Sequence, residues 1–200
     1  DGQIFLQSDL FNANQRPAID VGISVSRVGG AAQIKAMKSV AGTLKIGLAQ
    51  YRDMEAFAMF ASDLDAASRR QLDRGARLVE LLRQPQYSPY PVAEQVISVW
   101  GGTTGKFDNV PVSDVLRYER EFLDYLRHNT KVLDTIAETG QFTADTEQVV
   151  LEAMEGFKAQ FVSGDGKPLA TGDPVSAPIA DEDLDHEQIV VKKIPTKKRG

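Results

Sequence analysis

The sequence of 200 residues contains no cysteine and only two histidines, His128 and His186. Disulfide frameworks, Cys-based zinc sites and His-rich metal sites are therefore excluded. Positive charge is also in short supply: the net charge is −5 at pH 7, which argues against a general nucleic-acid-binding protein. No apolar run approaches the roughly 20 residues of a transmembrane helix, so we expect no direct membrane insertion. The start at Asp1, without the pattern of a signal peptide, favours a piece of a longer chain.

Residues 1–43 have the composition of strands and turns in their first part. Apolar and small residues alternate between Ala18 and Val28, which predicts a period-two strand ending at Gly29-Gly30. One or two strands do not form a stable sheet by themselves. We therefore expect residues 1–43 to be the end of an α/β domain whose other strands lie outside this sequence.

Residues 44–162 change to helical periodicity and predict an all-α bundle of about five helices, so the fold class is mainly α. We expect Asp63 or Asp65 to cap the second helix and Pro91 to take the first position of the third. Ser113 is expected to cap a long fourth helix, which ends at Gly140. Thr143 is expected to cap the fifth helix.

Residues 163–200 differ in composition from the bundle. Glycine and proline interrupt any period, an acidic run follows, and the end is basic. This pattern predicts a flexible C-terminal extension that is largely disordered in isolation. Within it, residues 181–194 suit a short helix with acid first and base last, and Ile189–Val191 equally suit an added strand.

Two Gly-Lys stretches resemble phosphate-binding loops without meeting their requirements. In Gly101–Phe107 the spacing is one residue short, and Phe107 replaces the Ser or Thr that would bind Mg²⁺. Gly164–Lys167 precedes Pro168, so no helix N-terminus follows. We expect a loop between helices at the first stretch and a linker at the second. His128 is expected to be an ordinary surface or packed histidine.

Arg27 stands at the end of the predicted strand beside Ser24, Ser26 and a diglycine. One interpretation is a surface arginine or a salt-bridge partner. The other is a guanidinium group presented at a strand end, where it can stabilise phosphoryl charge supplied by a neighbouring chain. The pattern alone leaves both open.

Longer stretches carry a resemblance that covers about residues 1–162. The segments RPAIDVGISVSRVGGAAQ, LAQYRDMEAFAMFASDLDAASRRQLDRGARLVELLRQPQYSP and PVAEQVI closely resemble the α subunits of F-type ATP synthases. The resemblance implies that residues 1–43 end a RecA-like nucleotide-binding domain and that residues 44–162 form the C-terminal helical domain. The extension at 163–200 resembles that of some bacterial α subunits.

The resemblance also implies roles for individual residues. Arg27 falls on the arginine finger that reaches the catalytic site of a β subunit, and Ser24 falls on a serine needed for activity on the same strand. The adenine pocket of the non-catalytic site is implied to contain Arg16, Pro17, Gln84 and Gln86. The acidic turn at Asp63–Asp65 is implied to face the γ rotor.

The implied cofactors and partners belong to the whole subunit. ATP or ADP with Mg²⁺ is expected there, but the phosphate-binding residues would precede Asp1, so this chain alone is expected to be inactive and to bind no nucleotide tightly. The implied partners are β, γ and, through a preceding segment, δ, in a proton-translocating enzyme peripheral to the cytoplasmic side of the cell membrane. The extension is expected either to restrain ATP hydrolysis or to be solvated. The alternative is a stand-alone helical interaction module without a catalytic role.

Overall fold

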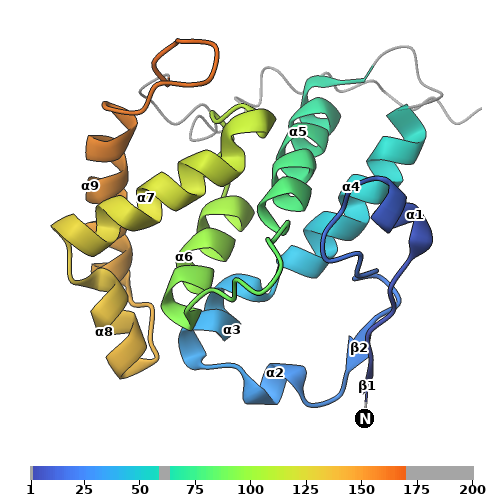
Figure 1. The fold of residues 1–200 in the computed structure, drawn as a ribbon, viewed down its shortest axis with the longest axis horizontal. Helices are drawn as coiled ribbons and strands as arrows, with labels where there is room; N and C mark the ends of the chain where they lie inside the picture. The colour runs from blue at the N-terminus through green and yellow to red at the C-terminus, as the bar shows by residue number, and fades with distance from the viewer. Residues whose placement is uncertain (1, 59–63, 170–200) are drawn as a thin grey trace, which may run out of the picture.

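The computed structural model describes residues 2–58 and 64–169, and this part of the chain is mainly helical (Figure 1). The short N-terminal elements are β1 (Gly2–Gln3), α1 (Ser8–Asn12), β2 (Val25–Ser26) and α2 (Gly29–Ala32). The bundle that follows consists of α3 (Lys35–Ala41), α4 (Leu44–Ala58), α5 (Ala66–Leu81), α6 (Val92–Thr103), the 3₁₀ turn η1 (Val112–Asp114), α7 (Val115–Asn129), α8 (Val132–Thr139) and α9 (Ala144–Lys158).

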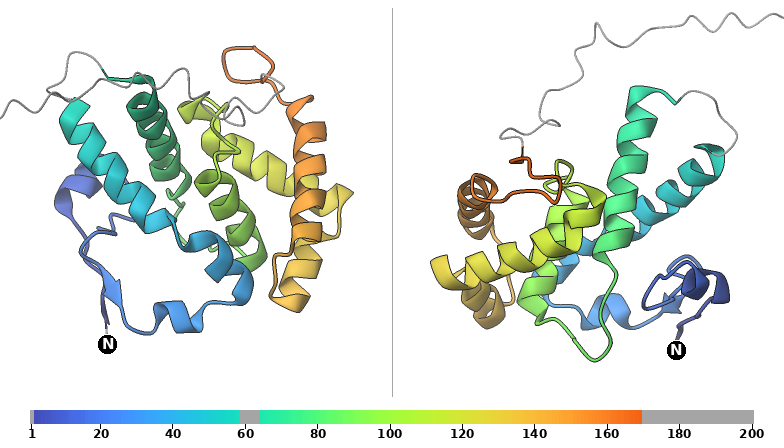
Figure 2. Two further views of the ribbon diagram at one scale, coloured as in Figure 1. Left: turned by 180° about the vertical axis from the view of Figure 1, so that it is seen from behind. Right: turned by 45° about the horizontal axis from the view of Figure 1, so that its top comes forward.

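Helix α6 lies in the middle of the bundle. The N-terminal elements lie beside α4 at one end, and α8 and α9 lie at the other end, as Figures 1 and 2 show. Val96 and Ile97 on α6 are fully buried, because this helix packs against α3, α5 and α8. Among the described residues, none of the helices is both long enough and apolar enough to cross a bilayer.

Aromatic side chains form the centre of the core where α7 meets α9. The centroid of the Tyr118 ring lies 5.2 Å from that of the Phe157 ring and 5.0 Å from that of the Phe161 ring, and both pairs have edge-to-face geometry. The centroid of the Phe107 ring lies 5.4 Å from that of Tyr118. Such pairs add about 0.5–1.5 kcal/mol to the stabilisation from buried area.

The predicted strand over Ala18–Val28 is wrong in extent. Only Val25–Ser26 forms a strand, antiparallel to Gly2–Gln3, and Ile19 makes a single bridge to Leu6. Between them the Asp20 carboxylate accepts hydrogen bonds from the backbone N–H groups of Gly22 and Ile23. Such a local Asx turn competes with ladder pairing, which explains the interruption of the alternating pattern.

The predicted long fourth helix is also wrong, because it is divided into α7 and α8. Thr130 has an extended backbone after Asn129, and its hydroxyl oxygen accepts a hydrogen bond from the N–H of Val132. Lys131 then occupies the N-cap of the second helix, α8. Ser113 lies inside η1, and Asp114 rather than Ser113 is the N-cap of α7. The bundle therefore contains more helices than the five expected.

Several other boundaries are confirmed by their geometry. Asp65 caps α5 by accepting hydrogen bonds from the N–H groups of Ala67 and Ser68, both at 2.9 Å. Thr143 caps α9, and Gly140 ends α8 with a left-handed φ of 65°. Pro91 occupies the N-cap of α6, one position before the expected one.

The two glycine-rich stretches have packing roles. A Cβ on Gly101 would lie 2.5 Å from the Phe107 ring, so this glycine lets the buried ring pack on α6. Residues 163–169, the first part of the predicted extension, turn back on the bundle: Leu169 is buried, and the N–H of Gly164 donates to Asp114. The predictions of a short helix at 181–194 or a strand at Ile189–Val191 concern residues that lie outside the described part of the chain.

Candidate functional site

Arg27 follows β2 directly, and its side chain is exposed. The loop before it is held by Ser24, whose hydroxyl accepts a hydrogen bond from the N–H of Phe5 at 3.1 Å and whose carbonyl accepts from Lys45 at 3.3 Å. After the strand, the hydroxyl of Ser26 accepts from the N–H of Gly29 at 2.9 Å. Ser24 and Ser26 therefore fix the backbone on both sides of Arg27.

An ion pair connects this N-terminal segment with the bundle. The Asp20 carboxylate lies 2.9 Å from the guanidinium group of Arg52 on α4. The hydrogen bond from Arg52 is the largest cause of the lowered pKa of Asp20, and the N–H groups of the turn at Gly22 and Ile23 also lower it. The turn before Ser24 is thus anchored to α4 by a charge-assisted hydrogen bond.

The predicted adenine-binding residues are brought together only in part. The N–H of Gln84 donates to the carbonyl of Arg16 at 2.8 Å, and the Arg16 guanidinium stacks on the ring of Phe11 at 3.6 Å from its centroid. Pro17 follows Arg16 through a cis peptide bond. Pro17 and Gln86 are exposed, and neither lines the pocket that Arg16 and Gln84 share.

That pocket, which we call the Arg16–Gln84 pocket, has a volume of about 530 Å³. Three arginines make its lining basic, and the only carboxylate among the lining residues, that of Glu80, lies 2.7 Å from Arg83. Its complete lining is Asn14, Arg16, Glu80, Arg83, Gln84, Pro85, Tyr90, Leu116 and Arg120. A partly apolar hollow with convergent basic and amide groups suits an anionic ligand that carries a planar polar ring.

Of the nine residues that line this pocket, the sequence analysis named only Arg16 and Gln84 as binding residues. Arg83 is next to Gln84 in sequence and could have been included by proximity. Tyr90 and Arg120 carry no local signal, because they come from the segment before α6 and from α7. Only the packing of α7 against α5 places Arg120 in the same pocket as Arg16.

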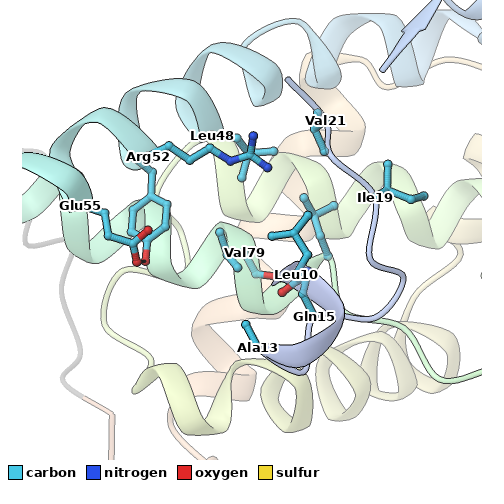
Figure 3. Close-up of a pocket in the computed structure, with 11 residues that line it drawn as sticks. Leu10, Ala13, Gln15, Ile19, Val21, Leu48, Arg52, Glu55 and Val79 are labelled. Carbon is cyan, nitrogen blue, oxygen red and sulfur yellow. Dashed lines mark hydrogen bonds between the residues drawn. The ribbon is translucent and has the colours of Figure 1, made fainter. Parts of the chain in front are cut away.

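A second, smaller pocket of about 240 Å³ lies between the N-terminal segment and helices α4 and α5 (Figure 3). Most of its lining is apolar, including Leu10, Leu48 and Val79. At its rim the Tyr51 hydroxyl donates to Glu55 at 2.8 Å, and burial, with the Glu55 bond as a second cause, raises the pKa of Tyr51 to about 12. The sequence carried no signal for this pocket.

The acidic turn is only partly described. Asp63 lies outside the described residues, and Asp65 uses its carboxylate to cap α5. Among residues 2–58 and 64–169, no group of three His, Cys, Asp or Glu side chains is arranged to hold a metal ion. His128 is exposed in the last turn of α7, where Nδ1 is 2.7 Å from the carbonyl of Asp124.

The class of protein is defined by residues 33–157, which contain most of the helical bundle. Residues 33–157 match the family model described as "ATP synthase alpha/beta chain, C terminal domain", and the chain belongs to this family. The match includes the region between Gln33 and Phe157, with α3 through most of α9.

Curated relatives specify the subunit that the chain is similar to. It is 71% identical over 193 residues to ATP synthase subunit alpha of Cutibacterium acnes, and 63% identical over 194 residues to that of Clavibacter michiganensis subsp. michiganensis. ATP synthase subunit alpha of Bifidobacterium adolescentis is 67% identical over 174 residues, which is 87% of this chain. The first two alignments cover 96% of this chain but only 35% and 36% of the relatives. The resemblance to α subunits is confirmed, and the chain spans about a third of their length.

Proposed function

We propose that this chain is the C-terminal part of the α subunit in the F1 sector of a proton-translocating ATP synthase. The observation that carries the proposal is the 71% identity to an ATP synthase subunit alpha across 96% of the chain. Exposed apolar side chains in the N-terminal segment agree with attachment to a larger body: Ile4 is 73% exposed and Leu6 is 71% exposed.

Arg27 is proposed to act as an arginine finger toward the catalytic site of a neighbouring β subunit. Its side chain is exposed directly after β2, and the backbone around it is fixed by Ser24 and Ser26. A guanidinium group held in this way can stabilise charge on the transferred phosphoryl group. Ser24 is proposed to support this geometry rather than to react.

The Arg16–Gln84 pocket is proposed to bind the base of ATP or ADP in the non-catalytic site of the whole subunit. Its basic lining and the amide of Gln84 support that assignment. Mg²⁺ and the phosphates would be held by parts of the subunit outside this sequence. Pro17 and Gln86, although exposed here, remain proposed contacts of the same base.

The partners proposed for the whole subunit are the β subunits of an α₃β₃ ring, the γ rotor and δ. The assembly would lie peripherally on the cytoplasmic side of the cell membrane. Restraint of ATP hydrolysis by residues 163–200 also remains a proposal, and most of that segment lies outside the described residues.

The decisive experiment is ATP hydrolysis by reassembled α₃β₃γ that carries Arg27→Ala in the full-length α subunit. We expect turnover to fall by roughly 10³-fold or more, with nucleotide still bound at the catalytic sites. Arg70→Ala, which removes another exposed arginine, is the matched control and should leave turnover unchanged. Unchanged turnover in Arg27→Ala would reject the arginine-finger assignment.

A further inference from the structure

Two carboxyl groups are buried on facing helices beside the Arg16–Gln84 pocket. Glu94 on α6 is 7% exposed, and Glu119 on α7 is 2% exposed. Glu94 has a cationic partner, since its Oε1 accepts hydrogen bonds from Nε of Arg127 at 3.0 Å and from a terminal nitrogen at 2.8 Å. Within the described part of the chain, no ion pair involves Glu119.

One oxygen of the Glu119 carboxyl group also lacks the hydrogen bond that a buried carboxylate requires. Its Oε2 and the hydroxyl oxygen of Ser98 are both buried, and neither has a partner of normal hydrogen-bond geometry among the described residues. Burial is the largest cause that raises the pKa of Glu119 to about 7, and the negative charge of Glu94 raises it further. The nearby hydroxyls of Ser98 and Tyr90 lower the pKa but do not offset the burial.

Glu119 belongs to the turn of α7 whose neighbouring residues line the pocket. Tyr90, which lines the pocket, is half-buried, and its pKa is raised first by burial and then by its interaction with Glu119. Leu116 and Arg120, three residues before and one after Glu119 on α7, line the same pocket. The inner face of this helical turn therefore carries Glu119, and its outer edge contributes to the pocket.

We propose that Glu119 is a positioning residue of the Arg16–Gln84 pocket, and that its buried carboxyl group holds Tyr90 and the Leu116–Arg120 turn in the pocket wall. A neutral carboxyl group can donate to one hydroxyl and accept from another, and the hydroxyls of Ser98 and Tyr90 are the available pair. An ionised carboxylate can only accept, and it would face Glu94 across the α6–α7 contact. Ionisation therefore loosens the wall and adds negative charge beside a basic pocket.

Other charged and titratable groups surround this contact and enter any dependence on pH. By element they are Tyr90 before α6, Glu94 on α6, Tyr118, Arg120 and Arg127 on α7, the Glu80–Arg83 pair at the end of α5, and Glu155 with Lys158 on α9. Burial, and then Glu155, shifts the pKa of Tyr118 far upward, so this group stays neutral in the range that matters here.

The test follows Tyr90 in the full-length subunit labelled with 3-fluorotyrosine, with the signal assigned through Tyr90→Phe. We expect its ¹⁹F resonance to shift with a midpoint of about pH 7, the pKa of Glu119. In Glu119→Gln the resonance should stay at its low-pH position. Glu121→Gln, which alters a partly exposed carboxylate on the same helix, should behave as wild type. A Tyr90 resonance that does not shift between about pH 5 and pH 9, or that shifts equally in Glu119→Gln, would overturn the proposal.

ATP binding to the same full-length proteins tests the consequence for the pocket, and this arm rests on the proposed function. Because ATP itself titrates near neutral pH, the ratio of affinities between wild type and Glu119→Gln is compared at each pH. We expect wild-type affinity to weaken by roughly fivefold relative to the variant as the pH rises through 7. A ratio independent of pH would contradict the proposal. If no ATP binds, the nucleotide assignment fails, and the Tyr90 resonance still decides the role of Glu119.

Discussion

The ring of Tyr51 on α4 occupies the space that a side chain on Gly75 of α5 would need. A Cβ added to Gly75 would lie 2.3 Å from Cδ2 of Tyr51 and 2.4 Å from its Cβ. Gly75 is buried, and its φ is not in the left-handed region, so close packing rather than backbone conformation requires glycine here. The approach of these helices also positions Tyr51 in the lining of the smaller pocket.

Gly75→Ala should therefore destabilise the protein although alanine is the better helix former. Overpacking typically costs about 1–3 kcal/mol, which exceeds the gain of up to about 1 kcal/mol in helix propensity. Urea unfolding measures the change in the free energy of unfolding. The control is Gly42→Ala, because Gly42 has a helical φ and nothing lies within 4 Å of its added Cβ. Equal effects at both positions would contradict the packing argument.

Glu119→Gln should change the way stability depends on pH. The pKa of Glu119 is about 7 in the folded protein against 4.5 for an unperturbed group. Between these values the folded state binds more protons than the unfolded state, so the free energy of unfolding of wild type falls as pH rises and levels off above the folded pKa. The loss amounts to about 3 kcal/mol.

A glutamine cannot ionise, so the variant should not show this loss. Measured by urea unfolding at several pH values, the stability of Glu119→Gln relative to wild type should increase from about pH 4.5 to about pH 7 and then remain constant. Glu121→Gln should show no such change, since the Glu121 side chain is partly exposed and paired with Arg117. A constant difference between Glu119→Gln and wild type would show that Glu119 titrates normally.

Arg127→Ala should leave the Glu94 carboxylate buried without its cation. Only 9% of the Glu94 side chain is exposed, so water compensates little for the loss of the two hydrogen bonds. We expect a destabilisation of about 2–3 kcal/mol in thermal or urea unfolding. Adding Glu94→Gln to Arg127→Ala removes the unpaired charge and should recover most of this loss. A double variant as unstable as the single one would attribute the loss to packing of the Arg127 stem instead.

The fold could be predicted where a helix carries its own signals. The apolar periodicity of α4, α5, α6 and α9 and the caps at Asp65 and Thr143 act within a few residues, and the structure confirms them. The strand over Ala18–Val28 was wrong because pairing requires partner strands, whereas the Asx turn at Asp20 needs only its own segment. The division of α7 from α8 occurs at Thr130, whose extended backbone is not revealed by periodicity.

The candidate site was predictable only through resemblance. The resemblance implied that Arg16 and Gln84 belong to one binding site. In the structure a backbone hydrogen bond joins these two residues, which are 68 positions apart in the sequence. Neither Tyr90 nor Arg120 could be found in this way, because Tyr90 comes from the segment before α6 and Arg120 reaches the pocket through the packing of α7 against α5. The unusual environment of Glu119 also arises from packing, as its sequence neighbours resemble those of any amphipathic helix.

Thr143→Ala tests the one helix start for which the sequence predicted the cap and the structure shows a complete capping box. The Thr143 hydroxyl accepts from the N–H of Thr146, and the Thr146 hydroxyl accepts in return from the N–H of Thr143 at 2.7 Å. Removing the side chain leaves an N–H at the first turn of α9 without its acceptor, and we expect a loss of about 1 kcal/mol in the free energy of unfolding. Thr143→Ser keeps the hydroxyl and should retain most of that stability. Phe157, near the other end of α9, stays packed in the aromatic core. In Thr143→Ala, amide hydrogen exchange should therefore become faster in the first turn of α9 but not around Phe157. Equal stability of the alanine and serine variants would show that the packing of α9, rather than its cap, determines where the helix begins.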